Sequence, residues 1–251
     1  MRKLIAVVGP TGSGKTSLGV SLARTFDGVI ISADSRQVYR GLDVGSNKEG
    51  KPGQWQTHRA RVINGVSQLM VDVVEPMERF SLAAWLSGAE KLVEEIFRQG
   101  KLPIVVGGTG LYVSALTEGY APGQGRFAKL KKRVSFESLI LYRHVDRQQL
   151  YQRLDKRYEE IFDALAEEIS RLVKAGVTPE WLLSLGLDYR FGTLFVLGQL
   201  DRAAAIAGLS RAGRGYIRRQ ITWWRHHGQP LPVNSTAEAE RFVRNFLNQR
   251  P

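Results

Sequence analysis

The chain has 251 residues, enough for one large domain, or for a domain with a smaller subdomain, and for a full hydrophobic core. It contains no cysteine, which excludes disulfide bonds, thiol catalysis and cysteine-bound zinc and is compatible with a reducing cytosol. The formal net charge is +12, and no apolar run approaches the roughly 18 residues of a membrane span. The sequence therefore predicts a basic, cytoplasmic protein without a signal peptide or a membrane partner.

The positive charge lies mainly in the second half of the chain. Residues 1–120 contain 14 basic and 11 acidic side chains, whereas residues 121–251 contain 22 and 13. No acidic residue occurs between Arg202 and Ala237. This distribution favours a polyanionic partner for the second half, and the alternative interpretation is a solvated charged face.

Residues 9–16 read Gly-Pro-Thr-Gly-Ser-Gly-Lys-Thr and lie between an apolar run, residues 4–8, and a helical pattern, residues 17–26. This is the G-x-x-x-x-G-K-T pattern in its strand, loop and helix context. Glycines let the backbone approach a phosphate group, and amides at the positive end of the helix bind its oxygens. The lysine adds a charge, and the threonine hydroxyl is a ligand for Mg²⁺. The predicted phosphate-binding residues are Gly9, Pro10, Thr11, Gly12, Ser13, Gly14, Lys15 and Thr16, with Thr16 as the metal ligand.

After this first unit, short apolar runs alternate with helical patterns, which is typical of a parallel sheet flanked by helices. Further strands are predicted at residues 28–33, 68–74, 102–106 and 136–142. A helix that ends at Gln99 is predicted to have Ser81 as its N-cap and Gly100 as its stop. Residues 49–66 have no clear period and are predicted to be irregular.

Polar residues follow two of the predicted strands. Asp34 comes directly after the second strand, and Gly-Gly-Thr-Gly-Leu-Tyr at residues 107–112 follows the fourth. Because ligands of parallel α/β sheets bind outside the carboxyl ends of the strands, we expect both segments beside the phosphate loop, around one shared anion site. Residues 34–48 are polar and rich in glycine, which is typical of a functional loop. Asp72 is a further candidate for metal coordination, although its spacing is loose.

The second half of the chain is predicted to be mostly helical. Asp146 can cap a long helix that runs to about Ala175, on which Arg153 and Arg157 share one face. The alternative is that these arginines are solvated and pair with acidic residues of the same helix. Further helices are predicted after Pro179, after Gly186, over residues 201–227, and from Thr236 as cap to about Asn248.

The predicted fold class is α/β. A P-loop NTPase-like parallel sheet flanked by helices occupies residues 1–145, and a helical, basic part occupies residues 146–251 and packs on it. In residues 201–227 the helical period separates an apolar side, most simply core, from an arginine side that suits a nucleic-acid backbone. A third side offers aromatic rings for base stacking. The three sides are Ile217, Ile221 and Trp224; Arg211, Arg214, Arg218 and Arg225; and Tyr216, Arg219 and Trp223.

Several segments taken together identify a family. The phosphate loop is followed by Asp-Ser-Arg-Gln-Val-Tyr-Arg-Gly-Leu-Asp-Val-Gly at residues 34–45 and by the glycine-rich residues 107–112. Residues 150–157, 186–190 and 218–223, the last reading Arg-Arg-Gln-Ile-Thr-Trp, agree with the same pattern. In this order, and over most of the chain, the motifs resemble those of the tRNA dimethylallyltransferases, or tRNA isopentenyltransferases, which modify the adenosine next to the anticodon.

The resemblance implies a prenyl transfer. The dimethylallyl group of dimethylallyl diphosphate would go to N6 of adenosine 37, in tRNAs that read codons beginning with U, with release of diphosphate. Asp34 would accept the proton of the weakly nucleophilic amine. The phosphate loop would hold the diphosphate, whose developing charge would be stabilised by Lys15, by Mg²⁺ at Thr16, and by Thr109 and Arg157.

The resemblance also implies a macromolecular partner, the anticodon stem-loop of tRNA, and we expect the chain to act as a monomer. The flipped adenine would need side chains that hold it outside its stack. By resemblance, the residues that contact tRNA would be Asp34, Ser35, Arg36, Gln37, Gly186, Tyr189, Arg190, Arg218 and Arg219.

The chain departs from the family in the connection after residues 107–112. Typical members carry a helical insertion there, with an arginine-rich piece that contacts tRNA, whereas this chain has only residues 123–135. The basic run at residues 129–133 could replace part of that charge. The family's frequent histidine-rich approach to the third strand is replaced by Ser-Gln-Leu at residues 67–69. The missing subdomain affects the expected tRNA affinity and exclusion of water, but neither the diphosphate site nor Asp34.

Three alternative functions remain open on the sequence. A P-loop kinase of a small metabolite shares the strand, loop and helix, but the sequence has no arginine-rich lid with the usual spacing. An adenylate isopentenyltransferase would perform the same chemistry on a free nucleotide, and the basic second half argues instead for RNA. A non-catalytic RNA-binding protein is disfavoured by the presence of Lys15, Thr16, Asp34 and Thr109.

Overall fold

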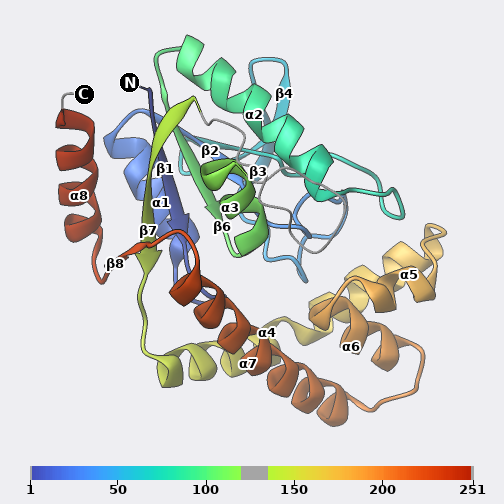
Figure 1. Ribbon diagram of the computed structural model, residues 1–251. Coiled ribbons are helices and arrows are strands. Elements are labelled where there is room, and N and C mark those ends of the chain that lie inside the picture. The colour runs from blue at the N-terminus through green and yellow to red at the C-terminus, as the bar shows by residue number, and fades with distance from the viewer. Residues whose placement is uncertain (1, 120–134, 250–251) are drawn as a thin grey trace.

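The computed structural model describes residues 2–119 and 135–249, and its centre is a single eight-stranded sheet (Figure 1). The strands are β1 (Arg2–Val8), β2 (Gly28–Ser32), β3 (Lys51–Trp55), β4 (His58–Ile63), β5 (Val66–Leu69), β6 (Leu102–Gly107), β7 (Phe136–Arg143) and β8 (Leu231–Val233). Their order in the sheet is β3-β4-β5-β2-β6-β1-β7-β8. The strands from β5 to β8 in this order are parallel, whereas β4 is antiparallel to both β3 and β5.

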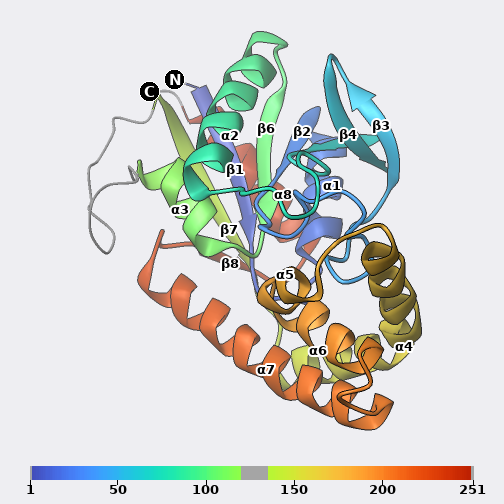
Figure 2. The same cartoon turned by 90° about the vertical axis from the view of Figure 1, so that its right-hand side faces the viewer.

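Helices cover both faces of the sheet and extend beyond one of its ends. On one face lie α1 (Lys15–Thr25) and α8 (Thr236–Asn248), which contact each other, and on the other lie α2 (Leu82–Arg98) and α3 (Gly110–Glu118). Figures 1 and 2 show the remaining helices as a separate group beyond the end of the sheet. This group contains α4 (Arg147–Lys174), α5 (Pro179–Ser184), α6 (Leu187–Val196) and α7 (Arg202–His226).

The central strand β1 shows why the sheet must be covered on both faces. Leu4, Ala6 and Val8 belong to the hydrophobic core that includes α2 and α3, whereas Ile5 and Val7 belong to the core that includes α1 and α8. All five side chains are fully buried. A strand buried on both faces reads as a continuous apolar run rather than as an alternating one, and for this reason β1 is recognisable in the sequence.

The structure corrects the prediction for residues 49–66. This segment is not irregular, because β3 and β4 form an antiparallel hairpin and β4 pairs in turn with β5. Asn64 and Gly65 connect β4 to β5 with φ angles of 49° and 81°, the left-handed conformations that a tight hairpin turn requires. The strands are short and partly exposed, so their apolar period is weak.

The predicted third strand is shorter than expected. It ends at Leu69 rather than at Val74, because Met70 and Asp72 have φ angles of 58° and 53°, which an extended strand cannot contain. Val74 instead forms an isolated parallel bridge with Tyr39, outside the named strands. The other three strands predicted after β1 are confirmed with small shifts of their ends, as β2, β6 and β7.

Side-chain caps account for several helix starts. Ser81 accepts a hydrogen bond from the Ala84 N–H, and Asp146 accepts from two amides of the first turn of α4, so both predicted caps are confirmed. The predicted cap of the last helix is wrong by one residue. Ser235, rather than Thr236, accepts the hydrogen bond from the Glu238 N–H.

The helical part has its own small core. Apolar side chains of α4, α6 and α7 pack together around Leu154, Phe162 and Leu209. The proposed division between residues 145 and 146 falls in the connection between β7 and α4. The last elements nevertheless return to the sheet layer, because β8 pairs with β7 and α8 contacts α1. Residues 231–248 therefore lie in space with the α/β part.

Some predictions concern residues that the structure does not describe. The exposed connection at residues 120–133 and the basic run at residues 129–133 lie outside the described residues, and the short connection at residues 123–135 lies almost entirely outside them. Within residues 2–119 and 135–249, no helix combines the length and the apolar character needed to cross a membrane.

Candidate functional site

A cavity of about 510 Å³ lies between the strand ends and the helices α4, α6 and α7. The sheet side contributes the phosphate loop, the segment after β2 and Gly107 at the end of β6. The helical part contributes the opposite wall, so the cavity joins the two parts of the fold. Its charged lining consists of Lys15, Arg36, Arg157 and Arg219 on the basic side and Asp34, Glu49 and Asp188 on the acidic side.

The loop between β1 and α1 has the backbone that a phosphate-binding loop requires. Gly12 and Gly14 both have a φ of 80°, in the left-handed region, and Gly14 is the N-cap of α1. A Cβ on Gly9 would lie 2.9 Å from the Ser13 Oγ, so a side chain there would displace the loop. Of the eight predicted residues, those in the cavity lining are Thr11, Gly12, Gly14, Lys15 and Thr16, whereas Gly9, Pro10 and Ser13 are buried.

Lys15 is the basic residue at the start of α1. Its Nζ lies 3.4 Å from the Pro10 carbonyl oxygen. Burial lowers the pKa of Lys15, and the carboxylate of Asp34 acts in the opposite direction. Additional negative charge in the cavity would favour the protonated lysine, so this end of the cavity is suited to an anion.

Asp34 lies at the cavity wall just after β2, as its position in the sequence predicts. Its Oδ1 accepts a hydrogen bond of 2.8 Å from the Arg36 N–H, which fixes the side chain in a turn. Thr109 holds the same turn, because its Oγ1 accepts from the Ser35 N–H at 3.2 Å and its N–H donates to the Ala33 oxygen at 3.1 Å. The two segments predicted to meet are therefore in contact.

Gln37 is engaged within the protein. Its Oε1 accepts from the Ser32 hydroxyl at 2.8 Å and from the Gln68 Nε2 at 3.1 Å. Its Nε2 donates to the carbonyl oxygens of Ser46 and Asn47 at 3.2 and 3.3 Å. The side chain thus holds the loop of residues 34–48 against β2 and β5. Its contact with RNA bases, implied by the resemblance, stays a prediction and would require exchange of these bonds.

The middle of this loop is held by a buried glutamate of α4, Glu168, of which only 2% is exposed. Its Oε2 accepts from the N–H groups of Asp43 and Val44, each at 2.7 Å, and its Oε1 lies 3.4 Å from the Gly45 N–H. The Tyr189 hydroxyl donates to the same carboxylate at 2.9 Å. A carboxylate that accepts several N–H bonds is well compensated for its burial.

A group of ion pairs holds the end of the loop. Lys48, whose side chain is fully buried, pairs with Asp72 and with Asp43. Arg61 of β4 pairs with the same two aspartates, each at 2.7 Å. Although burial acts against it, the bonds from Arg61 and Lys48 lower the pKa of Asp72. Asp72 is therefore a partner of two cations, and its interpretation as a metal ligand is wrong.

Two arginines of α4, which share one face of the helix as their spacing of four residues predicts, contact the loops at the strand ends. Arg153 donates to the Gly12 oxygen of the phosphate loop at 3.2 Å. Arg157 donates through NH2 to the Val44 oxygen at 3.2 Å and lines the cavity. The Nε of Arg157 is buried without a hydrogen-bond partner. Among the described residues neither arginine pairs with an acid of its own helix, so that part of the alternative interpretation is wrong, whereas Arg153 is exposed to solvent as that alternative expects.

Asp188, in the first turn of α6, is a half-buried acid that the sequence did not single out. Burial raises its pKa to about 6, although Arg157 acts in the opposite direction, and Asp34 and Glu168 add to the rise. Its Oδ1 is buried and has no hydrogen-bond partner. The folded protein therefore binds a proton at this site more tightly than the unfolded chain does.

Replacement of Asp188 by asparagine is expected to raise the free energy of unfolding at pH 8. The folded-state pKa lies above the unfolded value of about 3.8, so the ionised group opposes folding above pH 6, and this penalty disappears as the pH falls toward 4. The gain should be on the order of 1–2 kcal/mol at pH 8 and near zero at pH 4, because the residue borders an open cavity. Urea unfolding at the two pH values measures it, and an equal gain at both would contradict the assignment.

The residues predicted to meet RNA are distributed around the cavity mouth. Gly186 lines the cavity, and a Cβ on it would lie 3.6 Å from the Arg36 Nε. Tyr189 lines it too but is almost fully buried, whereas Arg190 is exposed beside it. Arg218 and Arg219 are exposed on α7, and Arg219 reaches the cavity.

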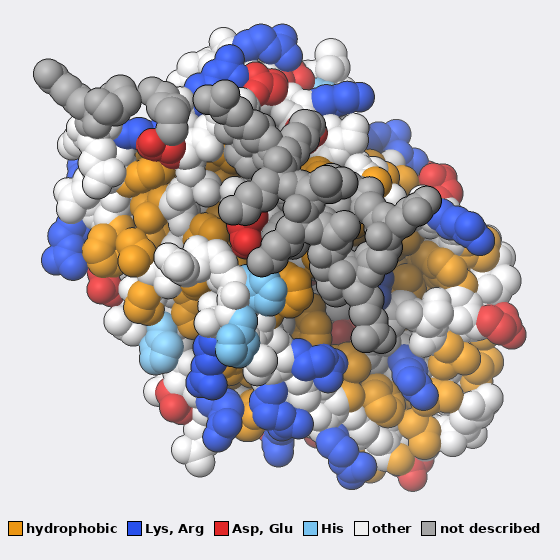
Figure 3. Space-filling view, viewed as in Figure 1, with side chains coloured by type: hydrophobic (Ala, Val, Ile, Leu, Met, Phe, Trp, Pro, Cys, Tyr) orange, Lys and Arg blue, Asp and Glu red, His pale blue; other side chains and the backbone are white. Residues whose placement is uncertain are grey.

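The basic side of α7 forms a surface next to the cavity. Arg211, Arg218 and Arg225 are exposed, whereas Arg214 pairs with Asp155 of α4. Figure 3 shows lysine and arginine side chains gathered over the lower part of the molecule, where α7 lies. The apolar side, with Ile217 and Trp224, is buried as predicted (1% and 3% exposed).

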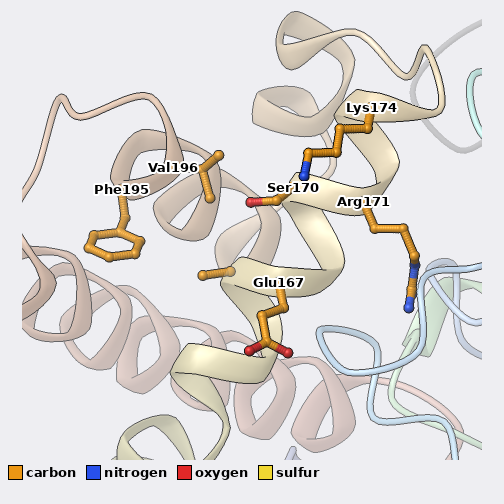
Figure 4. A pocket seen from close by; sticks show the side chains of 7 residues that line it. Glu167, Ser170, Arg171, Lys174, Phe195 and Val196 are labelled. Atoms are coloured by element: carbon orange, nitrogen blue, oxygen red, sulfur yellow. The ribbon is translucent and has the colours of Figure 1, made fainter.

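A second hollow, about 660 Å³, lies on the outer side of α4 and α6 (Figure 4). It is shallow, and its lining includes Glu167, Arg171, Lys174 and Phe195. Figure 4 shows Glu167 and Arg171 pointing away from Phe195 rather than converging on one point. This hollow contains no glycine loop, and the chemistry expected of the chain belongs to the first cavity.

Several residues of the cavity were missed by the sequence analysis. Glu168 interrupts the apolar stripe of α4 between Leu165 and Ile169, and a charge in such a stripe is the signal that could have revealed it. Asp188 had no comparable signal. The apolar lining, Val106, Leu154, Leu185 and Leu187, comes from separate parts of the chain and could not be assembled from the sequence.

Comparisons with known proteins place this site in a family. A family model described as IPP transferase matches residues 37–135 and 124–227. The tRNA dimethylallyltransferase of Streptococcus pyogenes serotype M4 is 31% identical over 306 aligned residues, covering 99% of this chain and 98% of the relative. That of Thermomicrobium roseum is also 31% identical, over 288 residues, 91% of this chain and 85% of the relative. Both alignments are longer than the chain of 251 residues, so both open gaps in it, in agreement with a missing insertion.

A solved structure agrees with these relatives. The tRNA delta(2)-isopentenylpyrophosphate transferase of Staphylococcus epidermidis superposes with a TM-score of 0.83 at 25% identity, and the match covers 100% of both chains. The two chains thus share one overall fold. The chain belongs to the IPP transferase family of tRNA-prenylating enzymes.

Proposed function

We propose that this protein transfers the dimethylallyl group of dimethylallyl diphosphate to N6 of adenosine 37 in tRNAs that read codons beginning with U. One observation supports this most directly. The cavity brings a phosphate-binding loop, the carboxylate of Asp34 and the basic helix α7 to one place. A phosphate loop beside a carboxylate suits a reaction in which an amine attacks and a diphosphate departs.

Asp34 is the proton acceptor in this proposal. The lone pair of an exocyclic adenine amine is delocalised into the ring, so N6 is a weak nucleophile. A carboxylate hydrogen-bonded to N6 removes its proton as the new C–N bond forms and the C–O bond of the diphosphate ester breaks. The bond from the Arg36 N–H to Oδ1 holds the side chain at the wall of the cavity, and it leaves Oδ2 for the amine.

The diphosphate occupies the phosphate loop, where the charge on the leaving oxygens grows during the reaction. Lys15, Arg157 and the amides at the start of α1 stabilise this charge. Thr109 supports the site through its bond to the Ser35 N–H. The apolar residues Val106 and Leu154 offer a dry surface for the allylic carbons.

Mg²⁺ fits this site as an ion held mainly by the diphosphate. The Thr16 hydroxyl lines the cavity, and no group of three or more His, Cys, Asp or Glu side chains in the described part of the chain could hold a metal alone. Mg²⁺ prefers few protein ligands together with phosphate oxygens and water. When bound, the ion would neutralise charge on the leaving diphosphate, and Thr16 would be its protein ligand.

The anticodon stem-loop of tRNA is the second substrate, and the protein acts on it as a monomer in the cytoplasm. The adenine must leave its stack to enter the cavity. The exposed arginines of α7 lie beside the cavity mouth and suit the phosphates of the RNA. A free nucleotide or a metabolite would have no use for this surface, so the adenylate isopentenyltransferase and kinase alternatives are less well supported.

The binding of RNA to α7 is expected to depend strongly on salt. If the exposed arginines contact about four phosphates, raising the salt from 50 to 200 mM should weaken binding by about 50- to 150-fold, because condensed counterions are released on binding. Arg218→Gln should lower the slope of log K against log salt by about 0.7–0.9. Fluorescence anisotropy with a labelled anticodon stem-loop measures both, and an affinity that does not change with salt would exclude this surface.

The reaction is tested with labelled dimethylallyl diphosphate. The label is offered with unmodified tRNA, with AMP, or with RNA in which position 37 is not adenosine. Incorporation into unmodified tRNA alone supports the proposal. Incorporation into AMP would indicate the adenylate enzyme, and transfer of phosphate from ATP to a metabolite, measured in parallel, would indicate a kinase.

A further inference from the structure

Gln220 of α7 connects the two glycine loops of the cavity. Its Oε1 accepts a hydrogen bond from the Thr11 N–H of the phosphate loop at 3.0 Å. Its Nε2 donates to the Gly108 carbonyl oxygen after β6, also at 3.0 Å. The residue is only 5% exposed. One side chain therefore joins two loops that come from different strands.

The glycines after β6 make this contact possible. A Cβ on Gly108 would lie 2.6 Å from the Gln220 Nε2, and a Cβ on Gly110 would lie 2.3 Å from the ring of Trp223, also on α7. Both distances are too short for a real side chain. These glycines therefore let α7 approach the sheet, and they need not serve as phosphate ligands themselves.

The contact between Gln220 and Gly108 lies next to Lys15, the basic residue of the phosphate loop. A Cβ on Gly108 would also lie 3.6 Å from Lys15 Cε and 3.7 Å from Lys15 Nζ. Gly108 thus lies close to both Gln220 and Lys15. The orientation of the Gln220 side-chain amide is also set, because its oxygen can only accept and its nitrogen can only donate, and each has a backbone partner here. The Thr11 N–H points to Gln220 and is not directed at a ligand.

We propose that Gln220 is a positioning residue that sets the spacing of the two glycine loops, and so the geometry of the diphosphate site, from α7. The same helix carries the basic surface proposed for RNA. Gln220 itself touches loop backbone only, so its effect on the reaction passes through Thr11, Gly108 and the neighbouring Lys15. This inference rests on the proposed function, because it takes the anion of the site to be a diphosphate.

Gln220→Leu is expected to weaken binding of inorganic diphosphate with Mg²⁺ by about tenfold, since the buried Gly108 carbonyl and the half-buried Thr11 N–H lose their partner. KM for dimethylallyl diphosphate should rise by a similar factor. Both kcat and the affinity for the anticodon stem-loop should change less than about threefold, because Gln220 touches neither the reacting atoms nor the exposed arginines.

Gln199→Leu makes the same chemical change at an exposed position and should alter none of these values. Isothermal titration and steady-state kinetics measure them.

A second set of variants keeps the test decisive if Gln220→Leu does not fold. Gly108→Ala should weaken diphosphate binding through its clash with the Gln220 side chain, and Gln220→Ala should relieve most of that effect. Non-additive effects on the diphosphate Kd support the contact, and additive effects overturn it. Equal diphosphate affinity in Gln220→Leu and in the unsubstituted protein would also overturn it. Failure of prenyl transfer by the unsubstituted protein would overturn only the proposed function, because diphosphate binding is measured without tRNA.

Discussion

Replacement of Asp34 by alanine is expected to lower kcat for prenyl transfer by about 10²- to 10⁴-fold, the usual contribution of a general base. Without the carboxylate, the proton on N6 has no acceptor as the C–N bond forms. Binding of diphosphate should change little, because the phosphate loop and Lys15 are untouched. Single-turnover measurements with labelled dimethylallyl diphosphate and tRNA give the rate, and titration with inorganic diphosphate gives the affinity.

Asp34→Asn separates this chemical role from a structural one. Asparagine keeps an oxygen that can accept the 2.8 Å bond from the Arg36 N–H, so the turn after β2 is preserved, but it cannot take a proton. We therefore expect Asp34→Asn to be nearly as slow as Asp34→Ala. Asp27→Asn removes an exposed carboxylate, that of the Lys101 ion pair, and serves as the control. Near-normal turnover of Asp34→Asn would show that Asp34 is not the base.

The second large effect concerns stability and is expected at Glu168. Glu168→Gln should lower the free energy of unfolding by about 2 kcal/mol, because the neutral carboxamide keeps one oxygen for the amides of Asp43 and Val44 but loses the charge that strengthens these bonds, and the Tyr189 hydroxyl must then accept rather than donate. Turnover should fall as well. Val44 also accepts the bond from Arg157, so movement of this loop reaches the cavity. Urea unfolding at neutral pH, together with kcat, measures both effects.

Two neighbouring variants calibrate this result. Tyr189→Phe removes one of the donors to Glu168 and should cost about 1 kcal/mol. Glu167→Gln makes the same substitution as Glu168→Gln at the adjacent, exposed position and should cost less than about 0.5 kcal/mol. A Glu168→Gln variant as stable as Glu167→Gln would mean that the carboxylate does not hold the loop.

The local sequence was sufficient to predict those elements that a pattern of a few neighbouring residues specifies. The continuous apolar run of β1, the glycine pattern before α1 and the Ser81 and Asp146 caps are all set by neighbouring residues, so each could be predicted. The hairpin of β3 and β4 was missed because it is short and partly exposed. Such strands are stabilised by pairing, β3 with β4 and β4 with β5, rather than by their own composition.

The sequence by itself determined those parts of the site that lie directly after parallel strands. A residue just after a parallel strand must lie at the carboxyl edge of the sheet, and this rule alone is enough to place Asp34 and Thr109 beside the phosphate loop. The helical period likewise placed Arg153 and Arg157 on one face of α4.

Only the tertiary structure decided how α4, α6 and α7 close the cavity over that edge. Gln220 bonds to Thr11, which lies 209 residues earlier in the chain, and Glu168 bonds to the N–H of Asp43, 125 residues earlier. Asp188 is half-buried, and its environment includes the charge of Arg157 on another helix. These environments arise where segments that are distant in the chain pack against one another. Contacts of this kind leave no periodic pattern and no fixed residue spacing in the sequence, so a single sequence cannot reveal them.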